Sequence, residues 1–220
     1  MSLSKILFRE GYLRTSSLPY STEQLDIKNN YIHLTNNAIQ KYSDKYGSFE
    51  EGNQLSFDDF QKFIDNSYKS SKISMKEDLF TKMKNQIKSS CLSVKKKINL
   101  NNRHYCYELL GYDFIIDSNF DVWLIEVNTN PCLEFSSSLL SQYIPRLLND
   151  AFKLTIDVLF PSRVDSPQAQ NYPVDKYKDE ENMFEYICDL KKPSNPKNSE
   201  FSNLRNPYLL LFDEIILSAK

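Results

Sequence analysis

Residues 107–128 read as two apolar runs joined by a polar turn, and Asp113, Glu126 and Asn128 interrupt the apolar runs. Asp113 lies in the first half of this stretch, and Glu126 and Asn128 lie in the second half. Carboxylates in apolar surroundings cost free energy unless a positive charge lies between them. Two carboxylates and one amide oxygen suit a hard cation, above all Mg²⁺, which keeps several waters and shares its shell with substrate phosphates. The alternative is a hairpin whose acidic side chains face solvent.

The same stretch predicts a β-hairpin that would bring these three side chains together. Its polar centre, residues 117–121, has the composition of a turn. A hairpin centred there places Asp113 opposite Glu126, and Gly111 opposite Asn128, all on one face. Directly opposed side chains lie roughly 5 Å apart. One cation could therefore serve both carboxylates, whereas a slip of one residue would separate them.

The remaining side chains of the hairpin are mostly apolar, which predicts a site that is partly enclosed. We expect one face to carry Phe114, Ile116, Trp123, Ile125 and Val127, with Trp123 in the core. We expect Ile115 and Leu124 to make the acidic face partly apolar as well.

Composition excludes several other classes of protein. The net charge of −2 over 220 residues does not indicate a nucleic-acid surface or a polybasic membrane anchor, and no apolar run is long enough to span a membrane. The four glycines form no phosphate-binding loop, and the four cysteines show no CxxC spacing, which favours a reducing cytosol over zinc or a disulfide framework. Lys95–Lys97 is typical of a solvated face, with a groove for an acidic protein tail as the alternative.

The elements around the hairpin are predicted from periodicity and capping residues. Strands are expected over residues 6–15 and 31–35. A helix begins after Ser56, a candidate N-cap, and its apolar stripe is Phe57, Phe60, Phe63 and Ile64. Further helices are expected over 75–98 and 133–160, and Pro145 would kink the latter or start a second helix.

The chain divides by composition near residue 160. Residues 1–160 form the predicted domain, of mixed α+β class with an antiparallel or mixed sheet flanked by helices. Residues 161–220 are a polar, partly flexible extension that ends in an apolar segment, residues 207–217. That segment is expected to pack back on the domain, with docking on a partner as the alternative.

Several short segments, in this order and spacing, resemble the tubulin–tyrosine ligase family over roughly residues 6–160. They are Phe8-Arg9-Glu10-Gly11-Tyr12-Leu13-Arg14-Thr15, His33-Leu34-Thr35-Asn36, Tyr46-Gly47-Ser48-Phe49-Glu50-Glu51-Gly52-Asn53, Gly111-Tyr112-Asp113-Phe114 and Trp123-Leu124-Ile125-Glu126-Val127-Asn128. The resemblance implies the C-terminal portion of an ATP-grasp fold. It also implies ATP-dependent ligation of an amino acid to a tubulin tail. In that reaction a carboxylate attacks the γ-phosphate of ATP to form an acyl phosphate, and an amine then displaces phosphate.

The resemblance also implies roles for particular residues. Asp113, Glu126 and Asn128 match the Mg²⁺ ligands of the family, with Glu126 placed to bridge ions. Arg14 matches the arginine that holds a carboxylate of the amino-acid substrate, which suits the fork of a guanidinium. Catalytic roles are therefore expected for Arg14 and Glu126. Contacts to the nucleotide or the amino acid are expected from Thr35, Asn36, Asn37 and Thr129.

The chain departs from the family pattern at its start. The phosphate-binding lysines and adenine-binding hinge of the family lie upstream of the segment matched by Phe8. We therefore expect the chain to be the C-terminal half of the catalytic module, with weak or absent ATP turnover by itself. The alternatives are a catalytically dead member that binds tubulin or microtubules, and an ATP-grasp ligase with another substrate.

Substrate and location follow from the resemblance only in part. The segment 46–60 favours tyrosine, but residues 129–134 differ from a typical tyrosine ligase, so glutamate and glycine remain open. The expected partners are tubulin tails or microtubules and the amino acid. The expected location is cytoplasmic and cytoskeletal, including the cilium or basal body.

Overall fold

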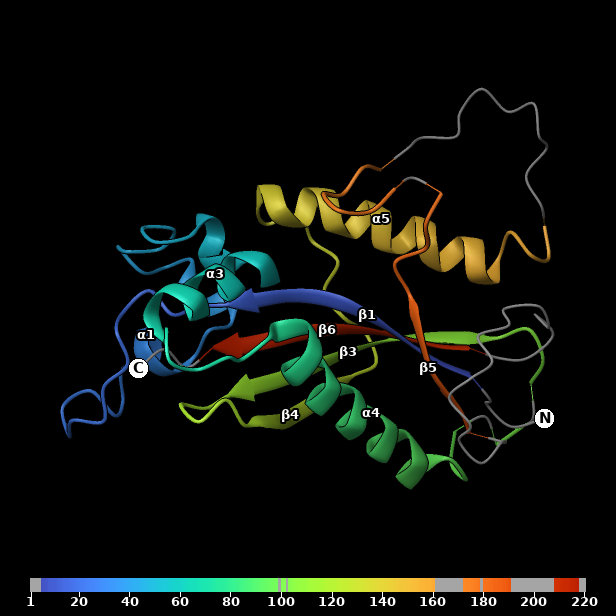
Figure 1. Cartoon of the computed structure of the whole chain (residues 1–220), viewed down its shortest axis with the longest axis horizontal. Helices are drawn as coiled ribbons and strands as arrows, with labels where there is room; N and C mark the ends of the chain where they lie inside the picture. Colours follow the sequence, from blue (N-terminus) through green and yellow to red (C-terminus); the bar gives the residue numbers. More distant parts are fainter. Residues whose placement is uncertain are drawn as a thin grey trace.

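A six-stranded mixed sheet lies between two helical layers (Figure 1). The computed structural model describes residues 5–98, 100–101, 103–160, 172–178 and 180–190, and the backbone of 208–217. The strands are β1 (Lys5–Arg14), β2 (Gln54–Leu55), β3 (Tyr107–Ile116), β4 (Val122–Asn128), β5 (Glu185–Asp189) and β6 (Tyr208–Leu217). Their order is β2-β1-β6-β3-β4, and β5 pairs with β1. The predicted mixed α+β class is therefore confirmed.

Strand β6 comes from the predicted C-terminal extension and lies in the middle of the sheet. It runs parallel to β1 on one side and to β3 on the other, whereas β1–β2, β1–β5 and β3–β4 are antiparallel pairs. Residues 208–217 of the predicted apolar segment thus form the strand that joins the two halves of the sheet. The division at residue 160 stays a prediction, because residues 161–171 and 191–207 lie outside the described residues.

One face of the sheet is covered by the helices between β2 and β3. They are α3 (Phe57–Ser67), a π-helical turn, η2 (Met75–Leu79), and α4 (Phe80–Val94). Ser56 caps α3 as predicted, since its Oγ accepts a hydrogen bond of 3.1 Å from the backbone N–H of Asp59. The core on this face combines alternate strand residues with one stripe of each helix: Ile6, Phe8, Tyr112, Phe114, Phe60, Ile64, Met83 and Ile87.

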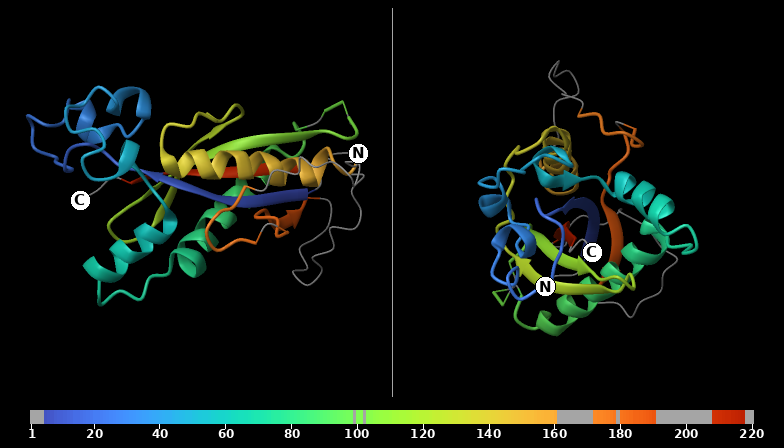
Figure 2. Two further views of the ribbon diagram at one scale, coloured as in Figure 1. Left: turned by 90° about the horizontal axis from the view of Figure 1, so that it is seen from above. Right: turned by 90° about the vertical axis from the view of Figure 1, so that its left-hand side faces the viewer.

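The opposite face is covered over β1 by α5 (Ser138–Thr155), as the end-on view in Figure 2 shows. Leu140, Ile144 and Leu147 pack on Leu7 and Tyr12 of β1. Helix α5 is shorter than the predicted 133–160. Pro145 lies within it and does not start a second helix.

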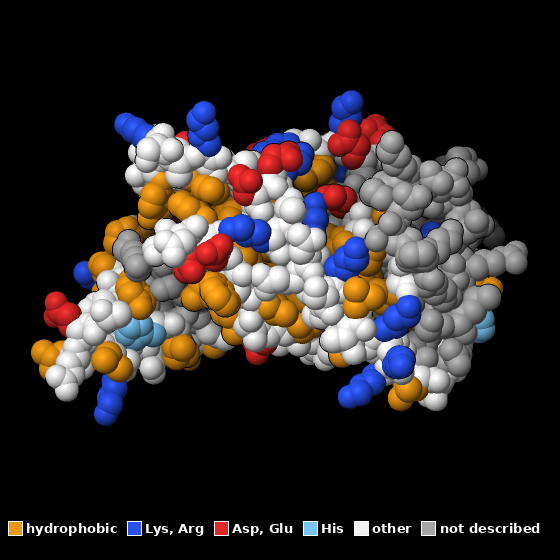
Figure 3. Space-filling view, turned by 60° about the horizontal axis from the view of Figure 1, so that its bottom comes forward, with side chains coloured by type: hydrophobic (Ala, Val, Ile, Leu, Met, Phe, Trp, Pro, Cys, Tyr) orange, Lys and Arg blue, Asp and Glu red, His pale blue; other side chains and the backbone are white. Residues whose placement is uncertain are grey.

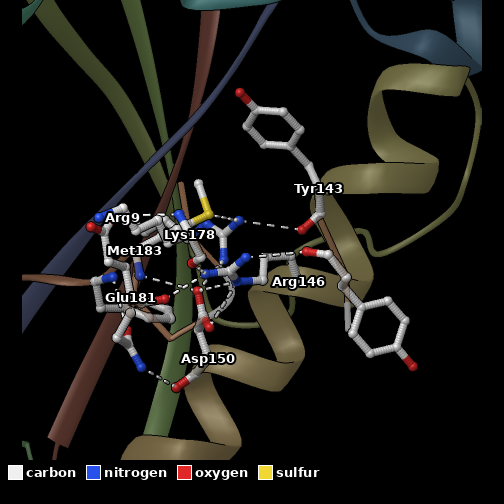
Figure 4. A network of polar contacts seen from close by, with 10 residues as sticks. Arg9, Tyr143, Arg146, Asp150, Lys178, Glu181 and Met183 are labelled. Carbon is white, nitrogen blue, oxygen red and sulfur yellow. Dashed lines mark hydrogen bonds and ion pairs between the residues drawn. The ribbon is translucent and has the colours of Figure 1, made fainter. Parts of the chain in front are cut away.

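A buried charged network fastens residues 172–178 and 180–183 to α5 and β1 (Figure 4). Arg146 donates from Nε to both carboxylate oxygens of Asp150, at 3.0 and 3.1 Å, and from Nη1 to the carbonyl of Tyr172 at 3.2 Å. Asp150 also accepts from the backbone N–H of Met183 at 3.1 Å and lies 3.6 Å from Arg9 of β1. Burial lowers the pKa of Arg9 to about 10, although the charge of Asp150 partly offsets this effect.

The predicted strand at residues 31–35 is wrong. Asn30–His33 forms a short helix, α1, and Asn37–Gln40 forms another, α2. Asn29 and Asn36 cap them, because their side-chain oxygens accept hydrogen bonds of 3.0 and 2.9 Å from the N–H two residues on. Local side-chain capping by asparagine therefore overrides the apolar alternation on which the strand prediction rested.

The predicted faces of β4 are also partly wrong. A β-bulge between the pairs Asp113–Glu126 and Phe114–Leu124 leaves Ile125 as an extra residue. Leu124 consequently packs toward α4 instead of lying on the acidic face. Trp123, expected in the core, is 59 % exposed, and Ile125 and Val127 are also exposed. Among the described residues, no helix has both the length and the apolarity needed to cross a membrane.

Candidate functional site

The register of the β3–β4 hairpin brings the predicted acidic residues together. Asp113 pairs with Glu126, and Gly111 pairs with Asn128, as the sequence predicts. A Cβ added to Gly111 would lie 3.1 Å from the Cβ of Pro131. Gly111 therefore lets the segment after β4 cross close over β3.

The three side chains differ in burial. Asp113 is 4 % exposed, whereas Glu126 is exposed and Asn128 is half-buried. Asn128 donates from Nδ2 to Oε1 of Glu126 over 3.2 Å. The site is therefore enclosed at β3 and open at β4, which is the edge strand of the sheet.

Arg14 lies beside Asp113 and not at a separate position. Its Nη2 donates to Oδ2 of Asp113 over 3.3 Å, and both side chains are buried. The contact reaches from β1 across the position of β6 to β3. The arginine expected to hold a substrate carboxylate thus neutralises one of the expected metal ligands.

The donor set fits a Mg²⁺ ion that retains much of its water and phosphate coordination. No group of three or more His, Cys, Asp or Glu side chains suited to a metal is found among the described residues. The predicted set comprises the carboxylates of Asp113 and Glu126 and the amide of Asn128. Asp113 and Glu126 pair across the hairpin, and Asn128 lies two residues after Glu126 on β4. A Mg²⁺ ion needs only one or two protein carboxylates when substrate phosphates complete its shell.

Thr35 and Asn36 lie between α1 and α2, and Asn37 is the first residue of α2. The Oγ1 of Thr35 is buried and accepts or donates no hydrogen bond among the described residues. Asn36 is exposed and its side chain caps α2, while Asn37 accepts a hydrogen bond of 2.6 Å from the hydroxyl of Tyr46. Burial raises the pKa of Tyr46 above its ordinary value of 10.0. No hydrogen bond or ion pair between described residues joins these three residues directly to the hairpin.

Two buried amides connect this region with the end of β1, and sequence reasoning gave neither a role. Gln40 accepts from the N–H of Ser17 at 2.9 Å and donates to the carbonyl of Leu34. Asn53 donates to Ser17 Oγ at 2.9 Å and to the carbonyl of Thr15 at 3.2 Å. Asn53 has a φ of +54°, a conformation in which asparagine is among the best tolerated residues. The position of Asn53 directly after Gly52 is the sequence signal that could have indicated this connecting role.

A second set of polar contacts, the Glu51–Gln54 clasp, joins the same region to the start of α5. Gln54 donates from Nε2 to Ser136 Oγ at 2.8 Å and accepts from Ser137 Oγ. The Oε1 of Glu51 accepts from the N–H of Ser138 at 3.0 Å, and hydrogen bonding from Ser138 lowers the pKa of Glu51. The clasp fixes the far end of the segment that begins with Thr129, which is exposed directly after β4.

Comparison with known proteins supports the resemblance on which these expectations rest. The model of the "Tubulin-tyrosine ligase family" matches residues 3–166. Tubulin glycylase 3D of Tetrahymena thermophila is 36 % identical over 155 residues, covering 68 % of this chain and 14 % of that protein. Probable alpha-tubulin polyglutamylase Ttll1 of the same organism is 32 % identical, covering 70 % of this chain and 36 % of that protein. The human protein named Inactive polyglycylase TTLL10 is 31 % identical, covering 69 % of this chain and 22 % of that protein.

The chain belongs to the tubulin–tyrosine ligase family. Its mixed sheet flanked by helices is consistent with part of an ATP-grasp-like fold. It spans between 12 % and 36 % of the length of eight curated relatives that it matches. Sequence and structure therefore describe one portion of what those relatives contain.

Proposed function

We propose that this chain supplies the metal-binding side of the active site of an ATP-dependent ligase that adds an amino acid to tubulin. The observation that carries the proposal is the pairing of Asp113 with Glu126 across β3 and β4, with Asn128 on the same face and Arg14 beside Asp113. Carboxylates gathered around a phosphate-bound cation, next to a guanidinium, match a reaction between a carboxylate and ATP.

In this proposal Asp113, Glu126 and Asn128 hold Mg²⁺. The bound ion supplies neutralisation of the charge that develops on the phosphate oxygens. Arg14 orients a carboxylate of the amino acid through its planar fork, and Thr35, Asn36, Asn37 and Thr129 contact the nucleotide or the amino acid. The buried Oγ1 of Thr35 has no hydrogen-bond partner among the residues that the structure describes, which supports a ligand contact there, because buried hydroxyls are normally hydrogen-bonded.

Glycine or glutamate is the amino acid that the comparisons favour. The relatives above carry the names glycylase, polyglycylase and polyglutamylase. Tubulin would then be the acceptor, and the protein would associate with the cytoskeleton. Incubation of tubulin with ATP and each amino acid in turn, followed by mass spectrometry of the tubulin tails, identifies the amino acid that is added.

Titration calorimetry with Mg²⁺–ATP tests the site itself. We expect the chain to bind Mg²⁺–ATP weakly and the Glu126→Gln variant to lose at least tenfold in affinity, since a charged ligand is replaced by a neutral one. Glu134→Gln, which changes an exposed carboxylate after the hairpin, is the matched control. Equal heats for the wild type and Glu126→Gln would show that Glu126 is not a ligand.

A second candidate is a tubulin-binding member without ligase activity. One observation favours it: a relative that is 31 % identical carries a name that calls it inactive. A chain of this kind would be recovered with microtubules in a pull-down assay. It would release no heat when titrated with Mg²⁺–ATP. Robust incorporation of an amino acid by this chain alone, dependent on Glu126, would exclude it.

A further inference from the structure

Glu126 lies on the same face as Asp113 because β4 contains a bulge. Before the bulge, Leu124 pairs with Phe114 and packs on the face that α4 covers. Side chains alternate along a strand, so Glu126, two residues later, would lie on that covered face in an unbroken register. The extra residue at Ile125 reverses this and places Glu126 opposite Asp113. The proposed metal-binding pair therefore depends on the position of the bulge.

The turn of the hairpin fixes the register on its own side of the bulge. The N–H of Asp117 donates to the carbonyl of Asp121 at 3.0 Å, and Oδ1 of Asp117 accepts from the N–H of Asp121 at 3.0 Å. The Oδ2 of Asp117 accepts from the indole of Trp123, also at 3.0 Å. Continued without a bulge, this register would place Ile125 opposite Asp113. The turn by itself thus favours an arrangement that breaks the proposed metal site.

Burial of apolar side chains does not explain the bulge either. In the bulged strand Trp123 is 59 % exposed and Ile125 is 51 % exposed. Figure 3 brings the side of the molecule with α4 forward, and hydrophobic side chains lie open to solvent between charged ones there. Apolar burial around the hairpin is therefore incomplete and does not select one register. A more specific contact is needed to hold the strand in its bulged form.

Gln86 of α4 supplies such a contact directly before the bulge. Its Nε2 donates to the carbonyl of Val122, and its Oε1 accepts from the N–H of Leu124 at 2.9 Å. Because β4 is the last strand of the sheet, the amide of Gln86 takes the place that a further strand would have at these two groups. It fixes the backbone on both sides of Trp123 and ends one residue before Ile125.

Gln86 belongs to a row of polar side chains on α4 that contact the hairpin. Lys82, four residues earlier, donates to the carbonyl of Phe120 in the turn at 2.8 Å. Ser90, four residues later, shares a hydrogen bond of 2.8 Å with the hydroxyl of Tyr112 on β3. Residues four apart lie on one face of a helix, so the row follows the hairpin from its turn to β3. Gln86 is the member of the row that contacts β4 beside the bulge.

We propose that Gln86 is a positioning residue for the metal site, because it holds β4 in its bulged form and so keeps Glu126 opposite Asp113. The inference rests on the proposed function for the role of Glu126. It adds a residue that acts from the face of the sheet opposite to the site. Gln86 touches neither metal nor substrate, and its effect passes through the backbone of β4. Without it, β4 continues in the register of the turn, with Ile125 opposite Asp113.

Nuclear magnetic resonance of the isotope-labelled chain tests the structural step without any ligand. In the wild type, cross-strand nuclear Overhauser effects should join Asp113 with Glu126. Gln86→Met keeps the length of the side chain and removes its hydrogen bonds. In this variant we expect effects between Asp113 and Ile125 to appear, and the amide of Leu124 to exchange about tenfold faster. Unchanged pairing of Asp113 with Glu126 in Gln86→Met would overturn the proposal.

Titration calorimetry with Mg²⁺–ATP tests the consequence for the site. We expect Gln86→Met to bind about tenfold more weakly than the wild type. The same change should have little further effect in the Glu126→Gln background, because both changes act through one ligand. Wild-type affinity of Gln86→Met, or full additivity of the two changes, would overturn the proposal. If the wild type itself releases no heat, the proposed function fails, and the register measured by resonance still tests the role of Gln86.

Two further variants of α4 separate positioning from loss of stability. Asn85→Met makes a similar change at the exposed neighbouring position and should behave as the wild type. Lys82→Met removes contacts of α4 with the turn, so it should lower the midpoint of urea unfolding. It should nevertheless keep Asp113 paired with Glu126 and keep the affinity for Mg²⁺–ATP. Equal loss of affinity in Lys82→Met and Gln86→Met would overturn the proposal, since general destabilisation would then explain both.

Discussion

The ion pair between Arg14 and Asp113 is the contact that most directly constrains the candidate site. A guanidinium beside a buried carboxylate stabilises the folded chain without bound ligands, because it neutralises a charge that would be costly alone. The same carboxylate is a proposed metal ligand. The stability of the folded chain and its affinity for a cation are therefore linked at Asp113.

Replacement of Arg14 should reveal this link. We expect Arg14→Ala to lower the free energy of unfolding by about 3 kcal/mol, because Asp113 stays buried beside one fewer cation. Added Mg²⁺ should restore part of the loss, measured as the midpoint of urea unfolding with and without the metal. Arg14→Lys, which keeps the charge but not the fork, should lose less. A variant equally unstable with and without Mg²⁺ would argue against a cation site at Asp113.

Glu10 gives the chain a specific pH dependence. Burial raises the pKa of this β1 carboxyl, although Lys176, Arg9 and a hydrogen bond with Tyr177 partly offset the effect. A carboxyl whose pKa is raised on folding binds its proton more tightly in the folded state. Stability is therefore lost as the pH rises from the ordinary value of 4.5 through the raised one.

The Glu10→Gln variant should lack this loss. The difference in unfolding free energy between Glu10→Gln and the wild type should grow in favour of the variant as the pH rises through that window, and then level off. Urea unfolding at a series of pH values measures it. A difference that is independent of pH would show that the ionisation of Glu10 is not disfavoured by folding.

At the scale of elements, the Glu51–Gln54 clasp determines where the segment between β4 and α5 lies. Gln54 is buried and contacts Ser136 and Ser137, and Ser137 in turn caps α5. Gly52 permits this approach, because its φ is +64° and an added Cβ would lie 3.1 Å from the carbonyl oxygen of Ser136. The candidate site has two parts, the region of Thr35, Asn36 and Asn37 and the β3–β4 hairpin with the segment after it. This contact between elements connects them.

Gln54→Leu tests the clasp. We expect a loss of about 2 kcal/mol in unfolding free energy, since buried partners lose their hydrogen bonds. Amide exchange should also become faster over residues 130–140. Gln142→Leu makes the same change at an exposed position of α5 and should have little effect. Unchanged exchange in Gln54→Leu would show that the segment is held by other contacts.

At the scale of the whole molecule, β6 decides whether the sheet is continuous. It pairs with β3 along all ten of its residues and with β1 along eight of them, and β1 and β3 do not pair with each other. Arg14 and Asp113 face each other across its position. The geometry of the candidate site thus depends on a strand, Tyr208–Leu217, that lies far from both Arg14 and Asp113 in sequence.

A proline in β6 should disrupt this arrangement. Leu211, in register with Phe8 and Leu110, lies in the interior of the strand, where proline removes a ladder hydrogen bond. We expect Leu211→Pro to lose cooperative thermal unfolding and to aggregate during size-exclusion chromatography, because two strand edges become exposed. Ser218→Pro, just beyond the strand, is the control. A monomeric, cooperatively folding Leu211→Pro variant would show that β6 is dispensable.

The sequence by itself determined the local elements whose signals are short-range. Alternation and a polar turn predicted the hairpin and its pairing of Asp113 with Glu126, and the cap at Ser56 predicted the start of α3. Short segments in a fixed order were enough to indicate the family. These features depend on neighbouring residues, so they can be read without knowledge of the fold.

The tertiary structure alone decided the contacts between distant segments. The bulge at Ile125, which exposes Trp123, depends on how β4 packs against α4. The Arg14–Asp113 pair, the clasp from Gln54 to Ser137 and the place of β6 each join residues far apart in the chain. Periodicity carries no information on which distant segments meet. That outcome depends on the burial of whole faces and on the satisfaction of buried polar groups.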